Sequence, residues 1–148
     1  MRIALGADHA GVNLKRDIRQ LLDERGLTYT DFGTNATDSV DYPDFAAKVA
    51  AEVAAGRFDV GILFCGSGIG MAIAANKVDG IRAAPVTDEQ SAHLAREHNN
   101  ANVLALGERV TPADLARQIV NTFLDTPFAG GRHQRRVDKI TALEHPSA

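Results

Sequence analysis

The sequence has one cysteine and no tryptophan among its 148 residues. A single cysteine, Cys65, excludes an intrachain disulfide and with it the class of small disulfide-stabilised secreted proteins. The chain has no run of about 18 apolar residues, so no transmembrane helix is expected. The apolar stretch near the N-terminus is too short for the hydrophobic region of a signal peptide. We therefore expect a soluble, cytoplasmic protein.

An excess of charge of either sign is also missing. The 16 basic and 19 acidic residues give a net charge of -3, which argues against nucleic acids and membranes as partners. No histidines have the i, i+4 spacing of a helical metal site, and no cysteine–histidine cluster is present, so no metal is expected. The length predicts one domain, 1–148, that is large enough to fold without a metal or a disulfide.

Short apolar runs alternate with segments of helical periodicity along the chain. The alternation predicts βαβ units, and therefore a parallel sheet covered by helices on both faces. The last segment, with Val137, Ile140 and Leu143, predicts a C-terminal helix. The predicted strands are 2–6, 28–32, 59–65, 81–86 and 102–107.

Several residues mark the ends of the predicted helices. Gly26 should end the first helix. Thr87, with Gln90 three residues later, forms the pattern of a capping box at the start of another. Thr111 followed by Pro112 predicts an N-cap with proline in the first helical position.

Three glycines follow the most apolar predicted strand. Gly66, Gly68 and Gly70 would let backbone N–H groups converge at the start of a helix, where the helix dipole favours an anion. Met71 breaks the dinucleotide-binding pattern G-x-G-x-x-G, and no Walker lysine is present. The loop therefore predicts a small anion site, although a tight turn without a ligand is the alternative.

Cys65 lies between this strand and the glycine loop. A buried cysteine is often only a small apolar residue, but the start of a helix stabilises a thiolate that can act as base or nucleophile. A cysteine phosphatase would need an arginine in the loop, and GSGIGMAIAAN has none. Arg132 and Arg136, four residues apart, can form either a solvated helix face or a phosphate clamp.

Five segments together resemble the type B ribose-5-phosphate isomerases and the related galactose-6-phosphate isomerase subunits. They span nearly the whole chain in order, which makes the resemblance far more specific than a glycine loop alone. The segments are GADHAG (6–11), DYPDFA (41–46), CGSGIGMAIAANKVDGIRAA (65–84), AREHNNANVLALGERV (95–110) and GGRHQRRV (130–137).

The resemblance implies a doubly wound, Rossmann-like three-layer αβα sandwich. It implies interconversion of an aldose phosphate and its ketose without metal or cofactor, with ribose 5-phosphate and ribulose 5-phosphate as the leading pair. This reaction belongs to the non-oxidative pentose phosphate pathway. A homodimer, or a tetramer, with active sites at the subunit interface is also implied.

By the same resemblance, Cys65 transfers the proton between C2 and C1, and Ser67 hydrogen-bonds near the reacting atoms. Asp8 and His98 assist sugar binding and ring opening. The backbone of residues 66–70 holds the enediolate oxygen. The substrate-binding residues implied are His9, Tyr42, Gly66, Gly68, Ile69, Gly70, Asn99, Arg109, Arg132 and Arg136.

Family members differ in the base, because some lack the cysteine and carry glutamate at the position of Met71. With Cys65 and Met71, this chain is similar to the cysteine subtype. Segment 84–91 departs from its relatives, which leaves a six-carbon sugar phosphate such as allose or galactose 6-phosphate as an alternative substrate. The residues are also compatible with a cysteine-dependent phosphatase, or with a non-catalytic module that binds phosphorylated metabolites.

Overall fold

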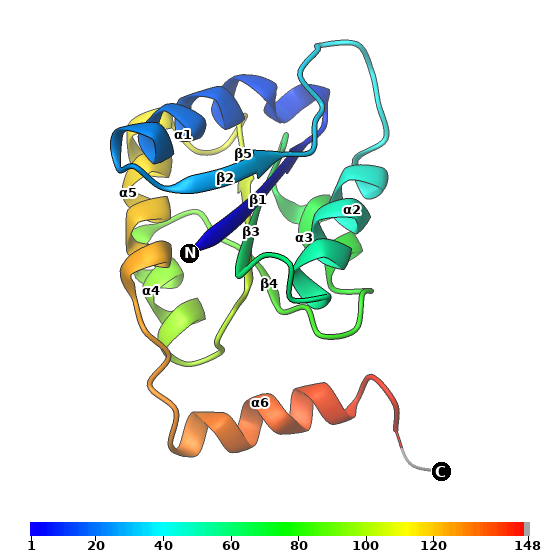
Figure 1. Cartoon of the computed structure of the whole chain (residues 1–148), viewed down its shortest axis with the longest axis vertical. Coiled ribbons are helices and arrows are strands. Elements are labelled where there is room, and N and C mark those ends of the chain that lie inside the picture. The colour runs from blue at the N-terminus through cyan, green and yellow to red at the C-terminus, as the bar shows by residue number, and fades with distance from the viewer. Residues whose placement is uncertain (147–148) are drawn as a thin grey trace.

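Five parallel strands lie side by side in the order β2-β1-β3-β5-β4 (Figure 1). The computed structural model describes residues 1–146, so the last two residues of the domain predicted over 1–148 lie outside the described part. The predicted α/β fold with a five-stranded parallel sheet is confirmed. The strands are β1 (Arg2–Ala7), β2 (Thr28–Asp31), β3 (Val60–Cys65), β4 (Ala83–Pro85) and β5 (Val103–Gly107).

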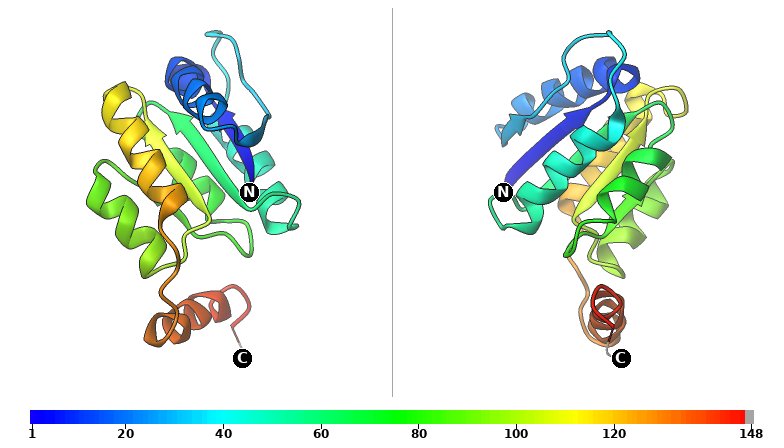
Figure 2. Two further views of the ribbon diagram at one scale, coloured as in Figure 1. Left: turned by 60° about the vertical axis from the view of Figure 1, so that its left-hand side comes forward. Right: turned by 90° about the vertical axis from the view of Figure 1, so that its right-hand side faces the viewer.

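Helices cover both faces of this sheet, which confirms the three-layer arrangement (Figure 2). One face carries α1 (Val12–Glu24), α4 (Glu89–Glu97) and α5 (Ala113–Asp125). The other face carries α2 (Tyr42–Ala54) and α3 (Ile69–Ala75). The C-terminal helix α6 (Arg132–Ala142) lies apart from these layers, beyond the amino ends of the strands (Figures 1 and 2).

Strand β3 is the centre of the core, because all six of its residues are buried. Successive side chains of a strand point to opposite faces. Ile62 and Phe64 accordingly join the core under α1 and α5, whereas Leu63 and Cys65 join the core under α2 and α3. The apolar run that predicted this strand thus faces protein on both sides, and it places Cys65 on the same face as α3.

The winding of the chain separates two loops at the middle of the sheet. From β1 the chain passes through α1 on one face to β2 at the edge, and it returns through α2 on the other face to β3. The loops that follow β1 and β3 therefore leave in opposite directions, and doubly wound sheets bind ligands at such a point. Strand β5 lies next to β3, with Gly107 opposite Cys65.

The predictions for two helix starts are wrong by one residue. Asp88, and not Thr87, caps α4, because its carboxylate accepts a hydrogen bond from the N–H of Ser91 (2.6 Å). Helix α5 begins at Ala113, because Pro112 has extended dihedrals (φ -60°, ψ 151°) and occupies the N-cap position in place of Thr111. Gly26, with φ +68°, does follow the end of α1.

Two elements are smaller or less buried than the sequence pattern predicts. Strand β4 is shorter than the predicted range 81–86. At its start, side chains accept the backbone hydrogen bonds: Asn102 Oδ1 accepts from the N–H of Arg82, and Asn76 Oδ1 accepts from the N–H of Ala83. In α6 only Val137 is buried, and Ile140 is exposed. None of the helices within residues 1–146 is long and apolar enough to cross a membrane.

Candidate functional site

A cleft opens at the carboxyl ends of β1, β3 and β5, where the winding of the sheet favours a ligand site. Its volume is about 580 Å³. The segments that directly follow these three strands all contribute to it. We call it the Cys65 cleft; its lining residues are Asp8, His9, Ala10, Tyr42, Cys65, Gly66, Ser67, Ile69, Gly70, Ile73, Arg109 and Val110.

Cys65 lies at the floor of this cleft with 5% of its surface exposed. The N–H of Gly68 donates a hydrogen bond to its Sγ atom at 3.1 Å. The sulfur therefore has a backbone donor from the residue that precedes α3. The position of the sulfur, at the edge of the core but open to the cleft, favours a chemical role over simple core filling.

Several backbone N–H groups of the glycine loop remain free to bind a ligand. Gly68 adopts φ +82°, a left-handed conformation that turns the strand into α3. Gly107 lets β5 approach this turn, since a Cβ atom there would lie 2.5 Å from the backbone of Ser67. Within residues 1–146, the N–H groups of Gly66, Ser67 and Gly70 have no acceptor, so they can hold an oxygen anion.

The start of α1, in contrast, is already occupied by a carboxylate. Glu108 Oε1 accepts a hydrogen bond from the N–H of Leu14 at 2.7 Å, and Oε2 contacts Asn13 Nδ2 at 3.4 Å. An acidic side chain at this place neutralises the positive end of the helix dipole. An external anion is therefore favoured at the start of α3 and not at the start of α1.

Asp8 and His9 follow β1 directly and have fixed orientations. Asp8 Oδ1 accepts a hydrogen bond from the N–H of Ala10 (2.9 Å), which leaves its second oxygen for a ligand. His9 Nδ1 accepts from the N–H of Val40 (3.1 Å). The carboxylate can accept from sugar hydroxyls, and the imidazole has one ring nitrogen left for a ligand.

Tyr42 and Arg109 flank the glycine loop on its two sides. The ring of Tyr42 lies so close to Gly70 that a Cβ atom there would be 2.5 Å from it. The guanidinium of Arg109 lies over Gly66, and it forms no ion pair with any acid in the described part of the chain. An unpaired guanidinium beside free backbone donors is suited to a phosphate.

The remaining predicted residues lie at the other end of the sheet. His98 follows the C-terminus of α4, and its ring stacks on that of His133 with centroids 4.3 Å apart. Asn99 lines a different cavity, and Arg132 and Arg136 are exposed on α6. The structure therefore divides the predicted site into the Cys65 cleft and a second group, which we call the His98 group: His98, Asn99, Arg132, His133 and Arg136.

The electrostatics of the His98 group are positive. Partial burial lowers the pKa of His133, and the charges of His98, Arg132 and Arg136 lower it further. Neither arginine forms an ion pair with an acid within residues 1–146. Glu97 is the nearby counter-charge: its Oε1 lies 3.3 Å from His98 Nε2. A cluster with surplus positive charge, open to solvent, is suited to an anionic ligand.

Exposed apolar residues lie beside both groups. Ile69 and Ile73 of α3 border the Cys65 cleft and are 57% and 59% exposed. Near the His98 group, Ile140 and Leu143 line a cavity of about 690 Å³ between α6 and the strand edge at β4. Neighbouring apolar side chains exposed in this way are typical of a surface that contacts another protein chain.

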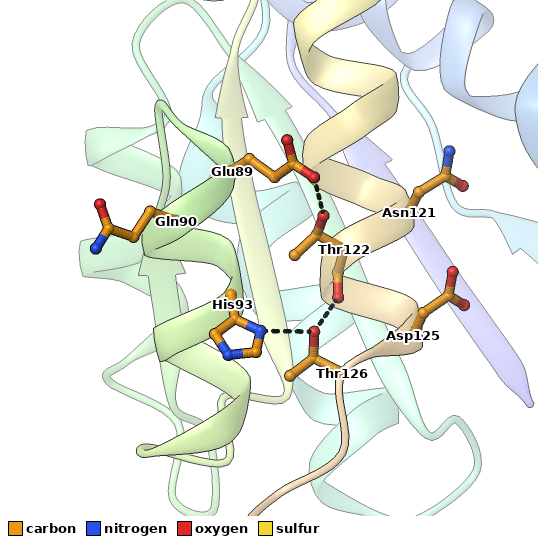
Figure 3. A pocket seen from close by; sticks show the side chains of 7 residues that line it. All are labelled: Glu89, Gln90, His93, Asn121, Thr122, Asp125 and Thr126. Atoms are coloured by element: carbon orange, nitrogen blue, oxygen red, sulfur yellow. Dashed lines mark hydrogen bonds between the residues drawn. The ribbon is translucent and has the colours of Figure 1, made fainter.

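A third hollow, of about 600 Å³, lies between α4 and α5 (Figure 3). Its polar groups already bind one another. Thr122 donates to Glu89 Oε1 (2.9 Å), Thr126 donates to the carbonyl of Thr122 (2.6 Å), and His93 Nδ1 contacts Thr126 Oγ1 (3.4 Å). No predicted site residue lines this groove, so it is best explained as the seam between two packed helices.

Some cleft residues were not predicted from the sequence. Ile73 and Val110 line the cleft, but nothing in their residue type indicates a site. Val40 contributes its backbone N–H, which the residue type does not indicate either. Glu108 follows β5 directly, but its residue type did not indicate that it would occupy the start of α1. Among residues 1–146, no group of three or more His, Cys, Asp or Glu side chains could hold a metal ion.

Comparison with known proteins identifies close relatives. The model of the Ribose/Galactose Isomerase family matches residues 3–140. Ribose-5-phosphate isomerase B from Escherichia coli (strain K12) is 50% identical over 143 residues, which cover 97% of this chain and 96% of that protein. The structure of ribose-5-phosphate isomerase B from Clostridium thermocellum superposes with a TM-score of 0.96 at 56% identity, covering 97% of each chain.

A further structure contains a ligand: ribose-5-phosphate isomerase B from Mycoplasma genitalium, with bound ribulose-5-phosphate. It superposes with a TM-score of 0.95 at 45% identity and covers 99% of this chain and 97% of that one. The family match over residues 3–140 includes both the Cys65 cleft and the His98 group. The chain belongs to the ribose/galactose isomerase family.

Proposed function

We propose that this protein interconverts ribose 5-phosphate and ribulose 5-phosphate through an enediolate, with Cys65 as the proton-transfer base. One observation carries the proposal. The Cys65 thiol receives a backbone hydrogen bond from Gly68, and it lines the same cleft as Gly66, Ser67 and Gly70, whose N–H groups are free within residues 1–146. A base and an oxyanion site are thus adjacent, which is what proton abstraction next to a carbonyl requires.

Ring opening is the first step, because ribose 5-phosphate rests mainly as a furanose. A proton must leave the C1 hydroxyl and another must reach the ring oxygen. His98 suits this acid–base work because an imidazole ring can both accept and donate a proton. The carboxylate of Asp8, held by the N–H of Ala10, accepts hydrogen bonds from the sugar hydroxyls and assists the step.

Proton transfer follows on the open chain. The Cys65 thiolate takes the proton from C2, and negative charge moves to the carbonyl oxygen at C1. The free N–H groups of residues 66–70 stabilise that charge; one such donor is worth ~3 kcal/mol. Ser67 hydrogen-bonds to the oxygens of the enediolate, where the proton on O2 passes to O1. Cys65 then returns its proton to C1, which gives the ketose with its carbonyl at C2.

The phosphate is held away from the reacting carbons. His9 and Arg109 supply donors from the Cys65 cleft, and Arg132 and Arg136 supply a guanidinium pair. Tyr42 and Asn99 contact the sugar. Binding energy from the remote phosphate fixes the position of C1 and C2 relative to the sulfur, and it thereby lowers the barrier.

The site requires two copies of the chain. The Cys65 cleft does not contain His98 or the Arg132 and Arg136 pair, and the His98 group does not contain Cys65. A homodimer in which the His98 group of one copy covers the Cys65 cleft of the other supplies both. The exposed Ile69 and Ile73 at one surface and Ile140 and Leu143 at the other support this assembly, since contact would remove them from water.

The need for a reduced thiol also favours one cellular compartment for the protein. Cys65 is the single cysteine of the chain and must stay reduced to act as a base. Cytoplasmic glutathione and thioredoxin keep thiols reduced. We propose that the protein works in the cytoplasm, where pentose phosphates are metabolised.

A substrate panel tests the proposed reaction. We expect kcat/KM for ribose 5-phosphate to exceed that for allose 6-phosphate and galactose 6-phosphate by at least about tenfold, because one extra carbon is discriminated by ~1–3 kcal/mol. Each ketose is measured as it forms. A preference for a six-carbon substrate would assign the chain to the galactose side of its family, and release of inorganic phosphate without a ketose would contradict an isomerase altogether.

A further inference from the structure

A lysine that has no part in the proposed chemistry is buried behind the cleft. The side chain of Lys15, on α1, is 1% exposed. Its Nζ donates to Asp31 Oδ1 (2.8 Å), to Asn35 Oδ1 (3.0 Å) and to the carbonyl oxygen of Thr34. Burial lowers the pKa of Lys15, and the hydrogen bond and charge of Asp31 oppose that shift. A buried ammonium with all three protons used holds its acceptors in place.

The acceptors of Lys15 lie at the last residue of β2 and at the start of the loop that joins β2 to α2, residues 32–41. This loop runs beside the end of β1. The N–H of Ala7 donates to the carbonyl of Gly33, and the N–H of Thr34 donates to the carbonyl of Ala7, both at 2.7 Å. Lys15 therefore fixes one side of a segment whose other side is bonded to the residue just before Asp8 and His9.

The far end of the same loop reaches His9 itself. The N–H of Val40 donates to His9 Nδ1 at 3.1 Å. A neutral imidazole that accepts at Nδ1 carries its proton on Nε2. Because His9 lines the cleft, its Nε2–H is the group left to donate to a ligand.

We propose that Lys15 is a positioning residue for His9. By holding the start of loop 32–41, it keeps the Val40 N–H on Nδ1 and so presents Nε2–H to the substrate phosphate. The identity of the ligand rests on the proposed function, whereas the ring tautomer is a property of the free protein and does not.

Nitrogen-15 NMR of the histidine rings in the ligand-free protein reads this tautomer directly. In the wild type, His9 should carry its proton on Nε2 and show an unprotonated Nδ1. Lys15→Met should convert His9 to the mixed tautomers of a free imidazole. Arg19→Met is the matched control, because Arg19 also pairs with Asp31 (3.2 Å) but donates no hydrogen bond to Thr34 or Asn35 within residues 1–146. It should leave the His9 signals unchanged.

Steady-state kinetics distinguish a positioning role of Lys15 from a general loss of structure, because the two affect KM and kcat differently. Lys15→Met should raise KM for ribose 5-phosphate about tenfold, the worth of one hydrogen bond to a charged group, and leave kcat within about twofold. The affinity for inorganic phosphate should fall by the same factor. In a His9→Asn background, Lys15→Met should add less than about twofold to KM, because its effect acts through the lost imidazole.

Val40→Pro keeps the test decisive if Lys15→Met fails to fold, since it removes the donor N–H of Val40 and leaves the buried lysine in place. It should shift the tautomer and raise KM in the same way. An unchanged His9 tautomer in a folded Val40→Pro or Lys15→Met variant would overturn the proposal, as would additive effects of Lys15 and His9. If the His9 tautomers are as expected but the wild-type protein has no isomerase activity, the result would contradict the proposed function and not the role of Lys15.

Discussion

Cys65→Ala should lower kcat for ribose 5-phosphate isomerisation by ~10²–10⁴-fold, the range for removal of a positioned general base. The physical reason is that the Cys65 sulfur is the base placed at the start of α3, beside the free backbone donors of the glycine loop. Met71, on the first turn of α3 beside the thiol, is fully buried and cannot accept a proton. KM should change little, because Cys65 makes no contact with the phosphate in the proposed complex.

Two further variants provide comparisons for the turnover of Cys65→Ala. Met71→Leu changes the other sulfur residue of the same core cluster, nearly conserves its volume and should keep turnover close to that of the wild type. Cys65→Ser keeps an acceptor for the Gly68 N–H but is a far weaker base, so its activity should fall almost as far as that of Cys65→Ala. Turnover of Cys65→Ala within a few-fold of the wild type would remove Cys65 from the chemistry.

His98→Asn should have a large effect that depends on the form of the substrate. Ribose 5-phosphate must be opened, and its isomerisation should fall by about 10²-fold when the acid–base group is lost. Ribulose 5-phosphate cannot close a furanose ring, because its C5 oxygen carries the phosphate. Exchange of its C1 proton with D₂O needs only the base and the oxyanion site, so the variant should retain this exchange.

The exchange experiment has an internal comparison. Cys65→Ala should lose both isomerisation and C1 exchange, whereas His98→Asn should lose only the first. His93→Asn is the matched control, because His93 is the other histidine bound to Glu97 (2.7 Å) and lies away from the proposed site. Equal loss of both reactions in His98→Asn would show that His98 has no special role in ring opening.

The sequence predicts the fold well because its strongest signals are local. The fully buried β3 and the glycine after α1 behave as their patterns indicate. The N-cap of α4 was misplaced because Thr87 and Asp88 are both good acceptors, and only the backbone geometry decides between them. The start of β4 was misplaced because the side chains of Asn76 and Asn102 accept the hydrogen bonds of the Ala83 and Arg82 N–H groups.

The candidate site was predictable where its residues are contiguous or follow neighbouring strands. Cys65, Ser67 and Arg109 belong to that part, and the structure brings them to one cleft. Glu108, which occupies the start of α1, and Val40, which orients His9, act across the fold through backbone groups. Residue type carries little information about such contacts, so sequence alone did not reveal them.

The separation of the His98 group from the Cys65 cleft has a different cause. The chain passes along α4 from the carboxyl to the amino ends of the strands, so His98 and α6 lie at the edge of the sheet opposite Cys65 (Figure 1). The family resemblance placed these residues in one site. One copy of the chain does not bring them together, and this is the physical reason for proposing that two copies do.

Co-expression of two inactive variants tests this account most directly. Cys65→Ala and His98→Asn, carrying different tags, should each be nearly inactive on ribose 5-phosphate. If each site combines Cys65 of one copy with His98 of the other, a mixed dimer has one site with both residues intact. With about half of the dimers mixed, activity should recover to about a quarter of that of the wild type. Purified mixed dimers with no more activity than the two parents would contradict the shared site.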